Sequence, residues 1–269
     1  MTAGLTPAAV ATASAAWNWY PTDATTVETD GYLLVRWPGY FRSPPHVIRF
    51  DPAAPVEETL DEVAGHVRGW GHDEVLVWVK LDAPPALEPS LRSRGGTIDE
   101  TVDVFALDLT AGSRALDVPD DLEVRWQVDE ATTRAVIQVG IEAFDEGSMP
   151  GDDRVRELAA EARADFDARR TAGALVYLDG RPVAAGGLTM AGDVARLWGG
   201  GVVPDARGRG AYRAILAARL DHAVSLGATT ALVKGRVETS GPVLRRAGFA
   251  VFGQERSYVV PVAPLVTAG

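Results

Sequence analysis

One stretch of the chain, residues 202–212, combines glycines and arginines in a spacing that could bind an anion. It reads Val-Val-Pro-Asp-Ala-Arg-Gly-Arg-Gly-Ala-Tyr, with Gly208 and Gly210 next to Arg207 and Arg209. Glycine lets the backbone approach a ligand closely and adopt positive φ, and the guanidinium group suits phosphate oxygens. The alternative is a tight connection with solvated arginines, and a short glycine turn alone would favour that alternative.

The residues on either side predict a strand before this turn and a helix after it. Residues 193–203 include the apolar run Val194–Trp198. After the turn, apolar residues recur with the i, i+3, i+4 spacing of one helix face, at Tyr212, Ile215, Leu216, Leu220, Ala223 and Val224. The first N–H groups of a helix have no partner within it, and the helix dipole favours an anion there. The sequence therefore predicts a strand, a glycine turn and a helix that together could hold a phosphate.

This motif resembles the acyl-CoA-binding motif of the GCN5-related N-acetyltransferase (GNAT) superfamily. The family pattern Arg/Gln-x-x-Gly-x-Gly/Ala falls on Arg207, Gly210 and Tyr212, and Tyr212 departs from the small residue usual at the last position. The resemblance implies acetyl-CoA as acyl donor, with backbone N–H groups near Val202 and Val203 polarising its thioester carbonyl. It implies CoA contacts at Val202, Val203, Arg207, Gly208, Arg209, Gly210, Ala211, Tyr212 and Thr239.

The expected order of elements extends the resemblance over about residues 121–262. We expect a strand, two helices (130–144 and 153–170), a hairpin across Asp179-Gly180 and a third strand before the glycine turn. A helix, a strand, a short helix and a final strand pair (249–252 and 258–260) follow, which matches the family order. The predicted fold class is α/β (α+β), with mixed, mostly antiparallel sheets flanked by helices.

The first part of the chain repeats this pattern in a weaker form. Residues 91–96 resemble residues 244–249, and residues 22–30 are predicted to be a loop. We predict two tandem GNAT-like modules, similar in layout to bacterial mycothiol synthases: residues 1–110, a linker at 111–120, and residues 121–269. Where the second module has its glycine turn, the first has Asp51-Pro-Ala-Ala-Pro55, whose prolines remove two N–H donors. We therefore expect a supporting role for the first module and not a second CoA site.

The residues that usually complete the family reaction differ here. The strand before the turn ends in Leu197-Trp198-Gly199-Gly200-Gly201, without the Glu that many members carry. The three glycines favour either close approach of a ligand or a β-bulge. Many family members also carry an Asn and a Tyr further along this domain. In this chain those positions are occupied by about Thr239 and Leu244. Thr239 or Ser240 could donate a hydrogen bond to CoA, but Leu244 cannot be an acid.

Three side chains are the candidate catalytic groups: Glu142, Glu146 and Tyr258. The two acids, with Asp145 between them, lie in a predicted loop that forms substrate sites in the family, and a solvated helix end is the alternative. Tyr258 could be an acid or a packing residue, and so could Tyr212. An amine acceptor has a pKa near ~10, so a base or a water chain must remove its proton before attack.

Composition limits the possible functions. The chain has no cysteine, which excludes disulfides, thiolate metal sites and a cysteine nucleophile. A net charge of −11 over 269 residues argues against a nucleic-acid partner. No His/Asp/Glu cluster has metal-ligand spacing, so we expect no metal. There is no apolar run of about 20 residues and no signal-peptide pattern, which predicts no membrane association and a cytoplasmic location.

The sequence thus predicts an N-acetyltransferase that moves acetyl from acetyl-CoA to the amine of a small molecule by direct attack, as a monomer or homodimer. Two alternatives are a non-catalytic CoA-binding module and a GNAT-fold protein with a different thioester reaction. A third is a Rossmann-type dinucleotide binder. It is disfavoured because Arg213 would replace the third glycine of that fingerprint.

Overall fold

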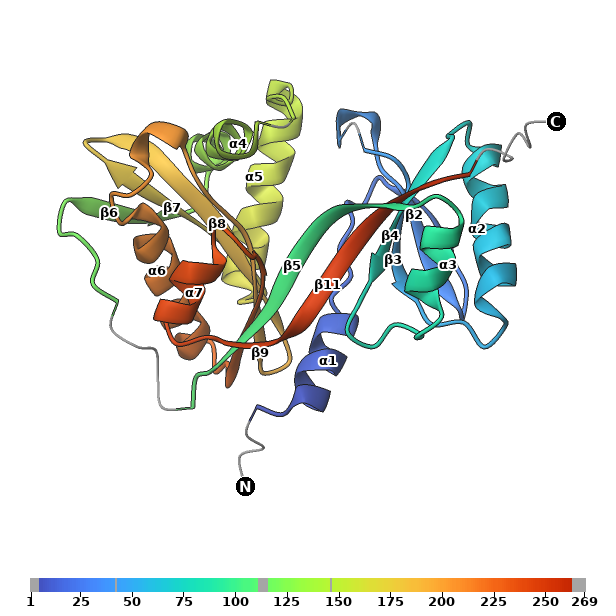
Figure 1. Ribbon diagram of the computed structural model, residues 1–269. Helices are drawn as coiled ribbons and strands as arrows, with labels where there is room; N and C mark the ends of the chain where they lie inside the picture. Colours follow the sequence, from blue (N-terminus) through green and yellow to red (C-terminus); the bar gives the residue numbers. More distant parts are fainter. Residues whose placement is uncertain (1–4, 42, 111–115, 146, 263–269) are drawn as a thin grey trace. The chain divides into compact units, whose positions relative to one another are not determined.

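The computed structural model describes residues 5–41, 43–110, 116–145 and 147–262, which form two compact units (Figure 1). Unit 1 comprises Phe105–Val251 together with residues 5–6. Unit 2 comprises Pro7–Val104 together with the chain from Phe252 onward. Among the described residues, no helix is long and apolar enough to cross a membrane.

Unit 1 is a mixed sheet with the strand order β5-β10-β9-β8-β7-β6. Neighbouring strands from β6 to β9 are antiparallel, whereas β10 runs parallel to β9. The strands are β5 (Thr97–Asp108), β6 (Leu122–Trp126), β7 (Thr171–Leu178), β8 (Arg181–Ala191), β9 (Val194–Val202) and β10 (Thr230–Arg236). The helices are α4 (Glu130–Phe144), α5 (Asp152–Asp167), the 3₁₀ turn η2 (Pro204–Ala206), α6 (Ala211–Ser225) and α7 (Gly241–Arg246).

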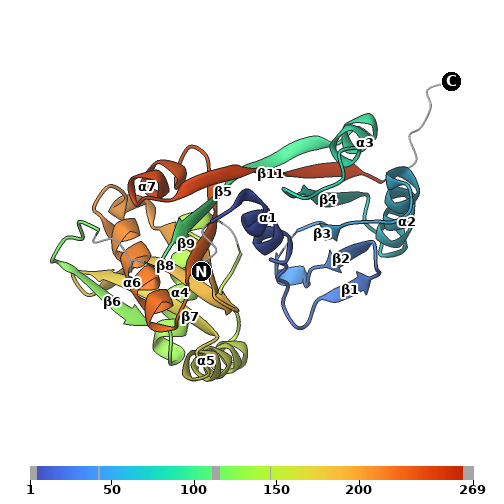
Figure 2. The same cartoon turned by 90° about the horizontal axis from the view of Figure 1, so that it is seen from below.

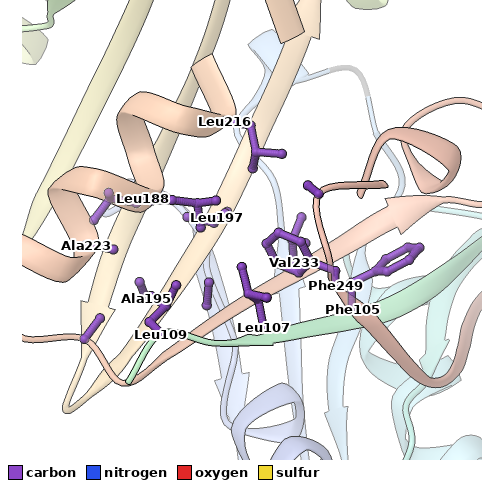
Figure 3. Close-up of a cluster of buried hydrophobic side chains, with 14 of the residues drawn as sticks. Phe105, Leu107, Leu109, Leu188, Ala195, Leu197, Leu216, Ala223, Val233 and Phe249 are labelled. Carbon is purple, nitrogen blue, oxygen red and sulfur yellow. The ribbon is translucent and has the colours of Figure 1, made fainter. Parts of the chain in front are cut away.

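Helices cover both faces of this sheet. A side chain at Gly200 would point at Tyr212 of α6, and one at the next residue, Gly201, would point at Ala143 of α4. Successive strand residues face opposite sides of a sheet, so α6 and α4 lie on opposite faces. Beneath α6, Leu216 packs over Leu197 of β9, and the same cluster includes Val233 of β10 (Figure 3). This core fixes α6, and with it the glycine turn, against the end of β9.

Unit 2 repeats much of this arrangement. The antiparallel strands β1 (Thr25–Glu28), β2 (Tyr32–Arg36) and β3 (His46–Phe50) are followed by β4 (Glu74–Val79), parallel to β3 (Figure 2). The helices are α1 (Pro7–Ala15), the 3₁₀ turn η1 (Gly39–Phe41), α2 (Val56–Gly69) and α3 (Leu87–Ser93). Leu60, Val63 and Val67 give α2 a buried face at helical spacing, and this face packs on Val47 and Val77 in one apolar cluster.

The same element order therefore occurs twice. Unit 2 runs β1-β2-β3-α2-β4-α3-β5, and the later part of the chain runs β7-β8-β9-α6-β10-α7-β11, where β11 is Ala250–Pro261. The last strands of the two repeats are exchanged: β11 pairs with β4, and β5 is the neighbour of β10. The predicted fold class, mixed and mostly antiparallel sheets flanked by helices, is confirmed. The exchange also means that the compact units depart from the predicted boundaries 1–110 and 121–269.

The predicted strand pair at the C-terminus is wrong, because β11 is one continuous strand. Polar residues 254–256 suggested a turn, but their side chains have partners along the strand. Glu255 is fully buried and accepts a hydrogen bond of 2.6 Å from Ser14 Oγ. Gln254 Nε2 donates to Asp103 Oδ1 at 3.0 Å. Polar side chains with such partners are compatible with a strand interior.

The predicted loop at residues 22–30 is also wrong, since it contains β1. This strand is short and polar, and only Val27 packs against the core of unit 2. It lies at the edge of the sheet, paired on one side with β2. An edge strand exposed in this way needs no alternating apolar pattern, so residues 25–28 show no strand periodicity.

Candidate functional site

The three glycines at the end of β9 form a β-bulge. Trp198 pairs with Gly187 and Gly201 with Ala185, so Gly199 and Gly200 both lie opposite Gly186. Gly199 has a φ of 61°, in the left-handed region that glycine adopts without steric cost. A bulge with glycine in this conformation bends the strand and increases its twist. The β-bulge is one of the two predicted explanations for the glycines.

The bulge coincides with the point where β9 and β10 stop pairing. Their parallel register ends at Leu197 and Val233, although β9 continues to Val202. The Val203 N–H donates to the Val183 carbonyl at 3.0 Å and is therefore committed to β8. Hydrogen bonding alternates along an antiparallel ladder, so Val202, opposite Ala184, directs its N–H away from β8. Of the two valines predicted to polarise a carbonyl, Val202 is the one whose N–H faces the β10 side.

The glycine turn leads directly into α6. Gly208 and Gly210 have φ values of 80° and 85°, so both use the conformation that favours glycine. Gly210 is the N-cap of α6, which has no side-chain cap and no acidic residue in its first turn. Arg209 is exposed beside this helix start. The first N–H groups of α6, with the helix dipole, therefore face an environment suited to an anion.

The residues just before β6 pack against the same turn. A methyl group at Gly210 would come within 2.7 Å of Pro119 Cδ. Arg213 Nη1 lies 3.6 Å from Asp117 Oδ2, whose side chain is 96% exposed. Residues 111–115 of the predicted linker lie outside the described part of the chain. Residues 116–120 are described, and two of them, Asp117 and Pro119, contact the start of α6 within unit 1. A side chain at Gly210 would consequently disturb packing as well as ligand approach.

The side chain of Arg207 donates hydrogen bonds to two backbone carbonyls. Its Nε donates to the Val202 carbonyl at 3.2 Å, and its Nη2 donates to the Ala143 carbonyl at 3.1 Å. It thereby connects the end of α4 to the end of β9. In agreement, a methyl group at Gly201 would lie 2.9 Å from Ala143 Cβ and 3.0 Å from Phe144 Cζ. The C-terminus of α4 is therefore held beside the bulge.

This contact brings the candidate acids of α4 near the bulge. Glu142 accepts a hydrogen bond of 2.7 Å from Gln138 and lies 3.4 Å from Arg181, which also pairs with Asp205 at 2.5 Å. The hydrogen bond from Arg181 lowers the pKa of Asp205. Asp145 is the C-cap of α4, with a φ of 56°. Glu146 lies outside the described residues.

Two predicted donors lie between β10 and α7, and the leucine that replaces the usual tyrosine lies in α7. Thr239 is exposed in the turn after β10, and Ser240 Oγ donates to the Arg236 carbonyl at 3.4 Å. Leu244 is fully buried, and its Cδ1 would lie 2.7 Å from a methyl group at Gly235. Thr239 is therefore the more accessible of the two hydroxyls.

Tyr258 lies on the part of β11 that belongs to unit 2. Its hydroxyl donates to Glu88 Oε1 at 2.6 Å and accepts from Arg92 Nε at 3.1 Å, and the residue is 1% exposed. Burial, together with the hydrogen bond to Glu88, raises the pKa of Tyr258. These contacts connect β11 to α3.

The sequence prediction missed Arg219, the bulkiest fully buried side chain among the described residues. Its Nε donates to the Ile215 carbonyl at 3.1 Å, and its Nη1 lies within 3.3 Å of the Gly187 and Trp198 carbonyls. Burial lowers the pKa of Arg219, and interaction with the Tyr212 hydroxyl opposes that shift. One feature of the sequence could have revealed it: Arg219 falls on the apolar face of α6, at position i+7 from Tyr212.

Comparison with known proteins gives consistent results. Residues 107–234 match the model of the acetyltransferase (GNAT) domain. A GCN5-related N-acetyltransferase from Kribbella flavida has a similar structure, with a TM-score of 0.65 at 18% identity over 88% of this chain and 90% of that chain. One from Sphaerobacter thermophilus gives 0.64 at 17% identity over 87% and 81%. A comparison with curated protein sequences finds no significant match.

A tandem GNAT protein from the clavulanic acid biosynthesis pathway is similar over 95% of this chain and 88% of its own, with a TM-score of 0.62 and 12% identity. The fold of the chain is thus similar to that of these N-acetyltransferase structures, and one of them is a tandem GNAT protein. The match of residues 107–234 to the GNAT acetyltransferase domain model agrees with the resemblance that the glycine motif indicated.

Proposed function

We propose that the protein is an acyl-CoA-dependent N-acyltransferase that transfers acetyl from acetyl-CoA to the amine of a small molecule. The observation that carries the proposal is the start of α6. It combines a glycine N-cap, no acidic residue in the first turn, and the exposed Arg209. The pyrophosphate of CoA would lie against the first N–H groups of this helix, because anions are stabilised there.

The bulge of β9 supports a direct transfer next to this site. The Val202 N–H, which is directed away from β8, would donate to the thioester carbonyl and stabilise the oxyanion that forms during attack. The amine nitrogen bonds to the carbonyl carbon, the C–S bond breaks, and the electron pair leaves with sulfur. Glu142 or Asp145 at the end of α4 would accept the amine proton directly or through water. The family resemblance supports Thr239 as a donor to CoA.

Calorimetric titration with acetyl-CoA tests the phosphate site. We expect Arg209→Glu to weaken binding by about tenfold or more, since it replaces a charge-assisted contact by repulsion. Arg163→Glu is the matched control, because it makes the same charge change on exposed α5, where Arg163 pairs only with Asp167 among the described residues. A change at Gly210 is less informative, because a side chain there would meet Pro119. Equal affinities of the wild type and Arg209→Glu would contradict this site.

Release of CoA in the presence of amines tests the transfer. We expect release to depend on an added amine and to fall in Arg209→Glu at limiting acetyl-CoA. Acetyl-CoA binding without release across a broad panel of small amines would favour the alternative of a CoA-binding module without transfer activity.

A further inference from the structure

The bulge of β9 is closely surrounded on both faces of the sheet. On the α6 face, a methyl group at Gly200 would lie 3.2 Å from Tyr212 Cε2 and 3.3 Å from Arg219 Nη2. On the α4 face, a methyl group at Gly201 would lie 2.9 Å from Ala143 Cβ. In the direction of the core, β9 and β10 are hydrogen-bonded to each other up to Leu197 and Val233, so no space is left between the two strands there. A group bound at the edge of β9 beyond Leu197 therefore has little room to extend.

The tyrosine ring on the α6 face is held in place by a buried cation. Arg219 is 1% exposed and directs its guanidinium group to three backbone carbonyls and to the Tyr212 hydroxyl. Moving the ring away would remove one partner of a buried guanidinium, which is costly. Tyr212 is therefore a fixed part of the site and not a mobile surface side chain.

This inference rests on the proposed function. We propose that Tyr212, held by Arg219, is the wall that restricts the acyl group of the donor to acetyl. With the thioester carbonyl at Val202 N–H, acyl carbons beyond the acetyl methyl would have to extend towards one face of the bulge, and Tyr212 occupies the α6 face. The small residue that the family motif usually has at this position would leave that space open.

The phenol ring of Tyr212 and the buried Arg219 favour a short acyl chain for a second reason. In an open apolar pocket each added methylene contributes about 0.8 kcal/mol of binding free energy, so longer thioesters would bind more tightly. Here added methylenes would meet a phenol ring and displace hydrogen bonds of the buried Arg219. Restricted pockets discriminate by roughly tenfold or more for each methylene that does not fit.

Titration of the full chain with acetyl-CoA, butyryl-CoA and hexanoyl-CoA tests the proposal. We expect the wild type to bind hexanoyl-CoA at least about tenfold more weakly than acetyl-CoA. Tyr212→Ala should bring the two affinities within about threefold of each other, whereas Tyr212→Phe, which keeps the ring but loses the hydroxyl that Arg219 holds, should give a ratio between those of the wild type and Tyr212→Ala. Tyr212→Leu should give an intermediate ratio, and it remains informative if Tyr212→Ala fails to fold. Tyr40→Phe, which removes an exposed hydroxyl of unit 2, is the control.

Three results would overturn the proposal: a wild type that binds hexanoyl-CoA as tightly as acetyl-CoA, folded Tyr212→Ala and Tyr212→Leu variants that keep the wild-type ratio, or tighter binding of succinyl-CoA than of acetyl-CoA. The last result would mean that Arg219 recognises a carboxylate on the acyl group. Absence of binding by every thioester to the folded wild type would remove the proposed function as well. That outcome differs from the other three, in which thioesters bind with a different selectivity.

Discussion

The two units contain the same strand-to-helix connection in two different chemical forms. In unit 1 it runs from β9 to α6, and in unit 2 from β3 to α2. Both strands carry a bulge: Leu33 pairs with Arg49 and Leu34 with Val47, so Ile48 is an extra residue in β3. Both strands also pair in parallel with the next strand only before the bulge. The bulge is therefore a property shared by the repeats and does not distinguish them.

The difference lies in the turn and the first turn of the helix. α2 begins after Pro55 and has Glu57 and Glu58 at its start, and Arg94 lies 2.6 Å from Glu57. These carboxylates already complement the positive end of the helix dipole. α6 begins at Gly210 without an acid. Of these two helices, only α6 therefore has a positive N-terminal end that is available to an external anion. The N-terminal end of α2 is already neutralised by its own carboxylates.

The largest expected effect comes from making α6 resemble α2. The double variant Arg209→Glu, Arg213→Glu places two acids at the start of α6. We expect acetyl-CoA affinity to fall by about 1,000-fold, roughly 4 kcal/mol, because two charge-assisted contacts become repulsive. Calorimetry gives the affinity, and circular dichroism monitors the fold. The converse change in unit 2, Glu57→Gln with Glu58→Gln, should create no acetyl-CoA site, and a second binding event there would break the comparison.

A pH dependence of unit 2 gives the next largest effect. Burial lowers the pKa of His46, at the start of β3, from 6.5 to about 4. The folded state therefore disfavours the protonated form. The free energy of unfolding therefore has its full value above pH 6.5. It decreases by about 3 kcal/mol in total as the pH falls towards 4.

Urea unfolding at several pH values, monitored for unit 2, should show this loss in the wild type. It should be much smaller in His46→Gln, which can still hydrogen-bond to Ser43 Oγ, now 2.8 Å from His46 Nε2. Identical slopes against pH for the two proteins would argue against a buried neutral His46.

The smallest effect tests the exchanged strand. Ser14→Ala removes the 2.6 Å hydrogen bond to Glu255 of β11, and both residues are fully buried. We expect the free energy of unfolding to fall by about 1–2 kcal/mol, because a buried carboxyl oxygen loses a donor. Ser93→Ala is the control, with an expected change within about 0.5 kcal/mol for its exposed side chain. Equal losses in both variants would mean that this bond does not hold β11 in unit 2.

The sequence was sufficient for elements whose residues show local patterns. Helical spacing predicted α6, and the Asp179-Gly180 turn predicted the hairpin of β7 and β8, because periodicity and turn chemistry act over a few residues. It was insufficient for β1, which is a polar edge strand, and for β11, whose polar residues depend on partners far along the chain. Glu255 is an example, since its partner Ser14 is 241 residues away.

For the site, the sequence by itself determined the glycine turn at the start of α6, since Gly208 and Gly210 adopt positive φ without steric cost. It also determined that residues 51–55 lack these glycines. Only the tertiary structure decided that Arg207 binds backbone carbonyls and that Arg219 is buried behind Tyr212. The reason is that a side chain's partners depend on which elements pack together. Spacing along one helix shows which face Arg219 lies on, but two of the three carbonyls that it contacts come from β8 and β9.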